Sequence, residues 1–202
     1  MNTEIEQFNA ALDRLRVLKC GNYVQDSEWR DSSVRLTHID SRLHLFLDQI
    51  LGPVNRTIKG LKWYPWGSHY VHYGNLLCLT EAMCVLQERY GARGVLDLYE
   101  NDDLCDAELI PFFTGPDGWL YCIENTYLDQ PDKRLLVIGD GARSERGVAE
   151  DARIRSAGVL HMSMAGLMEQ FADHAERKKN VAQDANDEIE ELIPPYSLIE
   201  WP

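Results

Sequence analysis

Residues 109–125, LIPFFTGPDGWLYCIEN, place two apolar runs on either side of a turn. Leu109–Phe113 is short, apolar and bounded by structure-breaking residues, which predicts a buried strand. In Gly115-Pro116-Asp117-Gly118, proline fixes φ, aspartate can bond its own backbone and glycine accepts a positive φ. Trp119–Glu124 is rich in residues that suit a pleated surface. The segment therefore predicts a β-hairpin in a central sheet, and the apolar run Leu135–Ile138 predicts a further strand.

Helical patterns lie on both sides of this strand region. Their apolar residues recur at intervals of three and four, as expected for helices that bury one face. Glycine ends several of these patterns, and Gly52-Pro53 is expected to end the second one. The predicted helices cover residues 3–19, 36–51, 80–90, 163–175 and 181–192, the last of them acidic.

The remaining segments carry weaker patterns. We predict a loop over residues 60–68, a short strand at 69–73 and an acidic connector over 95–108, while 139–158 is either a loop or a marginal helix. The order of helices, then consecutive strands, then helices predicts an α+β fold. This fold has a central, mostly antiparallel sheet flanked by helices, a helical N-terminal region and an acidic C-terminal helix. We expect one domain over residues 1–176 and an acidic helical extension over 177–202.

Charge limits the partners of the chain. The 202 residues carry a net charge of −13, and residues 101–202 hold 21 acidic but only 9 basic residues. A negative surface repels phosphate backbones and anionic lipids, which disfavours direct binding to nucleic acid or to a membrane. It suits a basic protein partner, although solubility alone also explains acidity.

The cysteines and the hydropathy pattern indicate a compartment. The chain has five cysteines, an odd number, and none is in a Cys-x-x-Cys pair. Buried free thiols in a reducing compartment explain this pattern. No apolar run approaches the roughly 20 residues of a membrane helix, and no leader pattern is seen at the N-terminus. We therefore expect a cytoplasmic protein.

No motif predicts a catalytic, cofactor or metal site. The run Val137-Ile-Gly-Asp-Gly-Ala142 begins like a dinucleotide-binding loop, but Ser144 stands where the third glycine is needed. His69 and His72 would face opposite sides of a strand, which is unsuitable for shared metal ligation. The acidic residues of the connector lack calcium-loop spacing. We therefore predict no catalytic residues, no metal ligands and no cofactor.

Two segments are candidate contact surfaces for a partner. One is the acidic connector, whose charges would complement a basic protein. The other is the aromatic segment 63–73, since tryptophan and tyrosine dominate many binding interfaces. The candidate partner-binding residues are Asp102, Asp103, Asp106 and Glu108 in the first segment and Trp63 and Trp66 in the second. Which segment makes the contact stays open, as does the oligomeric state. As an alternative, segment 63–73 lines the pocket of an enzyme or small-molecule binder, with His69 or His72 as acid–base group.

The hairpin segment also resembles a known family. Leu109-Ile-Pro-Phe112, the turn at Asp117-Gly118, and Trp119-Leu-Tyr-Cys-Ile-Glu124 are similar to the SUKH superfamily. That superfamily includes fungal cell-wall-synthesis regulators and many bacterial immunity proteins. The resemblance spans roughly residues 75–175 and includes the helix before the hairpin, the strand after it and a closing amphipathic helix. In the family, an aspartate usually follows the Tyr-x-Cys-like strand, and Glu124 stands at that position in this chain.

The resemblance implies a function in competition between bacteria. A SUKH-type immunity protein is not an enzyme, and it binds a cognate toxin domain and blocks that toxin's active site. Such toxins are often nucleases, which are basic because they hold phosphates, so the acidic half of this chain would attract them. A regulatory protein-interaction module is the alternative within the same superfamily.

Overall fold

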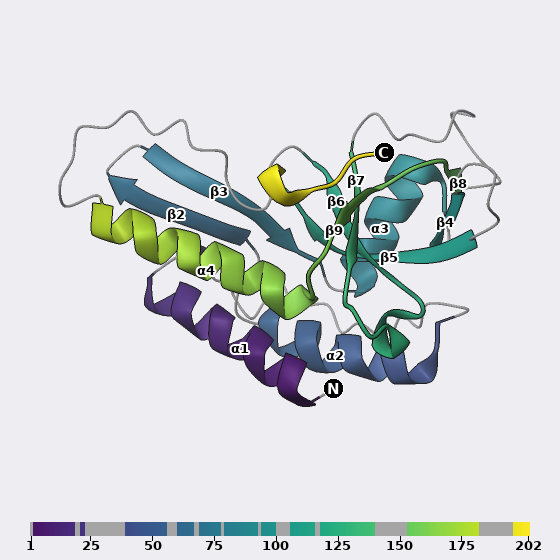
Figure 1. Cartoon of the computed structure of the whole chain (residues 1–202), viewed down its shortest axis with the longest axis horizontal. Helices are drawn as coiled ribbons and strands as arrows, with labels where there is room; N and C mark the ends of the chain where they lie inside the picture. Colours follow the sequence, from purple (N-terminus) through teal and green to yellow (C-terminus); the bar gives the residue numbers. More distant parts are fainter. Residues whose placement is uncertain are drawn as a thin grey trace.

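A computed structural model gives the fold and describes residues 2–18, 21–22, 39–55, 60–66, 69–77, 79–92, 94–99, 106–115, 118–139, 153–181 and 196–202. The described elements are α1 (Asn2–Val17), β1 (Gly21–Asn22), α2 (Ser41–Asn55), β2 (Gly60–Trp66), β3 (His69–Leu76), α3 (Leu79–Tyr90), β4 (Leu96–Tyr99), β5 (Asp106–Thr114), β6 (Leu120–Glu124), β7 (Leu135–Ile138), β8 (Arg153–Ile154), β9 (Gly158–Leu160) and α4 (Met164–Val181). Short 3-10 turns, η2 (Tyr127–Asp129) and η3 (Tyr196–Leu198), complete the set. Figure 1 shows the arrangement. The predicted α+β class is confirmed.

The strands form one curled sheet in the order β1-β2-β3-β5-β6-β7-β9. All its described pairings are antiparallel except that of β4 with β8, which confirms the mostly antiparallel prediction. β5 is the long central strand, because its first half pairs with β4 and its last residues pair with β3. As a result, β2 and β3 lie at one end of the molecule and β4 and β8 at the other (Figure 1).

The predicted hairpin is confirmed as β5 and β6. The two strands pair in antiparallel register from Leu109 opposite Glu124 to Thr114 opposite Leu120, with one irregularity after Pro111. Proline has no backbone N–H, so a position where the ladder is interrupted tolerates it. Every residue of β6 is buried, because helices cover both faces of this part of the sheet.

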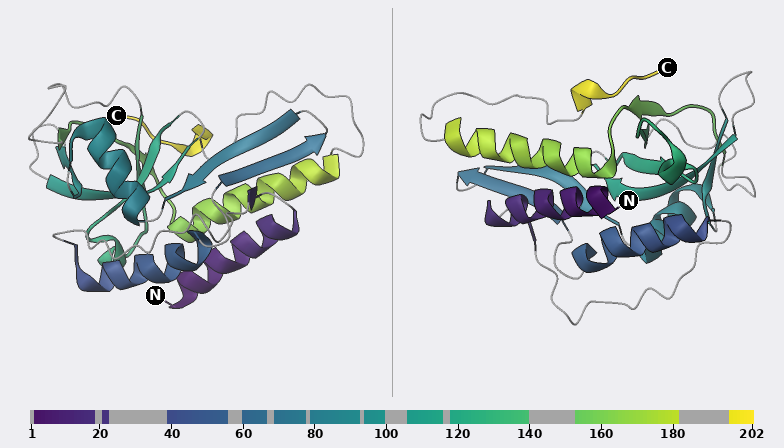
Figure 2. Two further views of the ribbon diagram at one scale, coloured as in Figure 1. Left: turned by 180° about the vertical axis from the view of Figure 1, so that it is seen from behind. Right: turned by 60° about the horizontal axis from the view of Figure 1, so that its bottom comes forward.

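Alternate residues of the strands contribute their side chains to two apolar clusters. The larger one unites buried side chains of α1, α2 and α4 with one face of the sheet, including Tyr121 and Ile123. The smaller one packs the end of α3 on the opposite face, against Leu120 and Cys122 among others. Figure 2 shows α3 from the side remote from α1 and α4. The period-two alternation thus sorts β6 side chains between two helical layers.

Helices α1 and α4 pack along each other, and charged groups join them. Arg14 on α1 donates hydrogen bonds to Asp173 (2.5 Å) and to both carboxylate oxygens of Glu176 (2.9 and 2.8 Å) on α4. These bonds raise the pKa of Arg14. The pairing fixes the relative position of two helices that are distant in the sequence.

Several predicted boundaries are wrong. Helix α2 begins after Asp40, whose Oδ1 accepts the Arg42 amide proton at 2.7 Å as an N-cap, and it continues through Gly52-Pro53. The loop predicted over 60–66 is strand β2, because pairing with β3 supplies its backbone partners and Pro65 falls in a register shift of that pairing.

Two further segments also contain strands that were not predicted. The supposed connector 95–108 contains β4 and the start of β5, and its acidic side chains had hidden the strand pattern. Segment 139–158, expected to be loop or helix, contains β8 and the start of β9. Residues 100–105 and 140–152 lie outside the described part of the chain.

The C-terminal region is described in part. Helix α4 runs through the expected boundary at residue 176, and its bounds also include the start of the helix predicted over 181–192. Residues 182–195 lie outside the described ranges, so the rest of that helix stays a prediction. Beyond them, Glu200 forms a bridge with Val159 of β9, so the last residues contact the sheet.

Candidate functional site

The predicted contact residues fall in two distant parts of the fold. Asp102 and Asp103 lie outside the described residues, and Asp106 is the first residue of β5, opposite Tyr99 of β4. Trp63 and Trp66 lie on β2, at the other end of the molecule from β4 (Figure 1). His69 and His72 lie beside them on β3, and only the backbone of this segment is described. The two predicted surfaces are therefore not brought together.

Glu108 connects the acidic segment to a larger group of polar residues. Its side chain is half-buried, and its Oε2 accepts a hydrogen bond from Nδ2 of Asn125 at 2.8 Å. The backbone oxygen of Glu108 also accepts the Asn125 amide proton at 3.0 Å. Oδ1 of Asn125 in turn accepts the amide proton of Asp40 at 3.2 Å. Asn125, just after β6, thus links the start of β5 to the N-terminus of α2.

Around this link lies a group of charged residues that we call the β6–β7 polar cluster. It surrounds the connection from the end of β6 to the start of β7 and includes residues of three other elements or their ends, α1, α2 and β5. Its members are Glu4, Asp40, Arg42, Glu108, Glu124, Asn125, Tyr127, Asp129, Gln130, Lys133 and Arg134. The carboxylates outnumber the cations by five to three, so the cluster keeps the acidic character of the chain.

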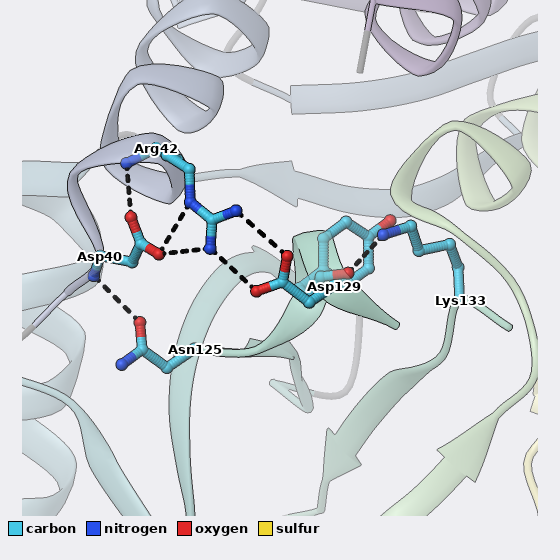
Figure 3. Close-up of polar contacts among 6 residues, drawn as sticks. Asp40, Arg42, Asn125, Asp129 and Lys133 are labelled. Atoms are coloured by element: carbon cyan, nitrogen blue, oxygen red, sulfur yellow. Dashed lines mark hydrogen bonds and ion pairs between the residues drawn. The ribbon is translucent and has the colours of Figure 1, made fainter. Parts of the chain in front are cut away.

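Arg42 joins two carboxylates on the outer side of the cluster (Figure 3). It binds Asp129 through both terminal nitrogens, at 3.1 and 2.9 Å, and binds Oδ2 of Asp40 at 2.7 and 3.0 Å. These bonds raise the pKa of Arg42 and lower the pKa of Asp40. Arg42 and Asp129 keep about 60% of their side-chain surface exposed, so a partner can reach this ion pair.

Glu124, the acid that ends β6, is held from within the same connection. Its side chain is only 8% exposed and accepts two parallel hydrogen bonds from Arg134, at 2.8 and 3.0 Å. Nε2 of Gln130 donates a third bond to it at 2.5 Å. A bidentate guanidinium–carboxylate pair is strong and directional. The pair of Glu124 with Arg134 therefore holds the end of β6 beside the start of β7.

Tyr127 anchors this connection to the helical layer. Its ring is buried, its hydroxyl donates to Glu4 of α1, and the hydroxyl oxygen accepts the Met164 amide proton at 2.9 Å, at the start of α4. Burial, followed by the nearby charge of Glu4, raises the pKa of Tyr127. Nζ of Lys133 lies 4.5 Å from the centre of the Tyr127 ring and donates to the Tyr127 carbonyl oxygen. Burial lowers the pKa of Lys133.

The arrangement suits recognition of a charged protein surface. Each carboxylate of the cluster accepts a hydrogen bond from within the protein, so the geometry is fixed before any partner arrives. Buried anchors hold exposed charges in place, which is what specific electrostatic docking needs. Among the residues that the structure describes, no group of three or more His, Cys, Asp or Glu residues is placed to hold a metal ion.

Sequence reasoning identified only Glu108 of this cluster as a contact residue, and Glu124 through the resemblance. Asp40 carried a local signal, since an aspartate before a helix favours N-capping. Arg42 and Asp129 are 87 residues apart, and no local pattern predicts their pairing. No helix in the described ranges is both long enough and apolar enough to cross a membrane.

Neither the family models, nor the curated proteins, nor the solved structures gave a match to this chain.

Proposed function

We propose that this chain is a non-enzymatic immunity protein of the SUKH type, which binds and neutralises a cognate secreted toxin in the cytoplasm. The observation that carries the proposal is the β5–β6 hairpin, with its Ile-Pro-Phe strand, its Gly-containing turn and its Leu-Tyr-Cys-Ile strand ending in Glu124, which is similar to the family's Tyr-x-Cys-like strand. The elements α3, β5, β6, β7 and α4 also occur in the order that the resemblance implies, with β4 inserted between α3 and β5 and with β8 and β9 inserted between β7 and α4.

The toxin would contact the end of the sheet that carries the acidic segment. The bond between Glu108 and Asn125 makes the start of β5 continuous with the β6–β7 polar cluster. Exposed carboxylates there, such as Asp129, would complement the basic surface of a nuclease. This surface combines Glu108, one of the predicted contact residues, with charges that hydrogen bonds within the protein orient.

Co-expression tests this proposal. The toxin domain to test is the C-terminal domain of whichever large secreted protein is found to be encoded beside this chain. We expect the chain to restore growth of cells that produce the toxin domain and to co-purify with it. We also expect the association rate to fall steeply with added salt, since electrostatic steering is screened. Rescue of growth without a physical complex would contradict the proposal and favour an enzyme that reverses the damage.

A matched pair of variants tests the location of the surface. Asp129→Asn removes one exposed carboxylate from the polar cluster, and Asp173→Asn removes one from the α1–α4 pair. Both aspartates are ion-paired to an arginine and more than half exposed, so the cost to folding should be similar and small. We expect several-fold slower toxin association for Asp129→Asn and little change for Asp173→Asn. The reverse order would place the toxin on the helical face instead.

A further inference from the structure

Glu200 forms an isolated antiparallel bridge with Val159 at the outer edge of β9. The amide of Val159 donates to the carbonyl of Glu200 at 2.7 Å, and the amide of Glu200 donates back to Val159 at 2.8 Å. β7 occupies the other edge of β9. The segment thus pairs with the edge of the sheet through backbone bonds, as a bound peptide does in strand addition.

The side chains on either side of Glu200 enter a slot that Gly158 leaves open. A Cβ atom on Gly158 would lie only 2.5 Å from Ile199 and 2.9 Å from the Trp201 ring, so this position has room for the segment only as glycine. The Trp201 ring also lies over Gly139, where a Cβ would be 3.6 Å away.

The two side chains meet different surroundings within the slot. Ile199 is buried in the large apolar cluster. Trp201 packs edge to face on Trp119, with ring centres 5.1 Å apart.

We infer that the edge of β9 is a binding site for an extended peptide of the pattern aliphatic residue, any residue, tryptophan, and that the protein's own C-terminus occupies it. The pattern follows from strand geometry, because residues two apart face the same side of a sheet. The inference is independent of the toxin proposal and of the acidic surface.

The bound segment is suited to displacement by an outside peptide. Within the described residues, a single backbone bridge joins it to β9. Trp201 also keeps 47% of its surface exposed, so its ring is only partly held. An outside peptide would make the same two backbone bonds to Val159 that Glu200 now makes, so it could replace the segment without loss of pairing. Such a partner would be recognised by backbone pairing and by its aliphatic and tryptophan side chains.

A fluorescent peptide tests the inference on the full-length chain. The probe is Ser-Leu-Ile-Glu-Trp-Pro, the sequence of residues 197–202, with a dye at its N-terminus. Trp201→Ala loosens the tethered segment and leaves the slot open, whereas the double variant Trp201→Ala with Gly158→Ala also fills the slot. Leu198→Ala is the matched control, since Leu198 is half exposed beside the segment. Circular dichroism and cooperative urea unfolding show that each variant is folded.

We expect saturable binding of the probe to Trp201→Ala and at least about 10-fold weaker binding to the wild type and to Leu198→Ala. The tethered segment competes at an effective concentration on the order of millimolar. The double variant should lose the binding. The inference is overturned if folded Trp201→Ala does not bind the probe, or if wild type or the double variant binds it equally well. Dimers that exchange their C-termini, without binding the probe, would also overturn it.

Discussion

The hydroxyl of Tyr127 joins three separated parts of the fold, so Tyr127→Phe should weaken the whole structure. The substitution removes only one oxygen atom. It leaves the Met164 amide at the start of α4 without its acceptor and removes the bond to the Glu4 carboxylate. A buried unsatisfied donor costs about 1–3 kcal/mol, and a hydrogen bond to a charged group contributes about 1.5–3 kcal/mol. Because the contributions overlap, we expect the free energy of unfolding to fall by about 2–3 kcal/mol.

Urea unfolding followed by circular dichroism measures this loss. The slope of the unfolding free energy against urea concentration should stay unchanged, which would show that the substitution changes only the stability. Glu4→Ala should weaken the protein less than additively when combined with Tyr127→Phe, since the two groups interact directly. Glu6→Ala, at an exposed acid on the same helix, is the control and should change stability by less than about 0.5 kcal/mol. A loss below about 0.5 kcal/mol for Tyr127→Phe would refute the reasoning.

Two further predictions concern single ionisable residues. Asp40→Ala should lower the unfolding free energy more than Asp40→Asn, because asparagine can still cap the Arg42 amide. Since Arg42 lowers the pKa of Asp40, the stabilisation by this carboxylate should be present at neutral pH and disappear as the pH falls below about 4, as acid titrations of both variants would show. Burial raises the pKa of the Cys122 thiol, so the folded state keeps a proton that the unfolded state loses above about pH 8.5. Stability should therefore fall with rising pH in that range, and Cys122→Ala should show a smaller fall by urea unfolding; equal slopes would contradict this.

The parts of the fold with strong local signals were predictable from sequence. Turn chemistry at 115–118 and the apolar runs beside it identified the β5–β6 hairpin, and periodicity identified α1, α3 and α4. Strand β2 was missed because Pro65 and the mixed aromatic pattern hide a strand that depends on pairing with β3. Strand β4 was missed because its acidic neighbours gave the segment the composition of a loop.

Much less of the candidate site than of the fold could be predicted from the sequence. Its central contacts join residues that only the tertiary fold brings together, such as Arg42 with Asp129 and Tyr127 with Glu4. The same holds for the C-terminal segment, where Gly158 gave no sign that it leaves space for Ile199 and Trp201. The residue types alone predicted that the surface is acidic. Only the structure shows which buried or paired residues hold these charges in place.

The central claim is that the chain neutralises a toxin by occupying it rather than by turning over a substrate. Titration of the toxin domain's activity with the purified chain tests this claim most directly. We expect activity to fall linearly and to reach its floor at one equivalent, independent of incubation time once the complex has formed. Complete inactivation by a small fraction of an equivalent, progressing with time, would show catalysis and contradict the account.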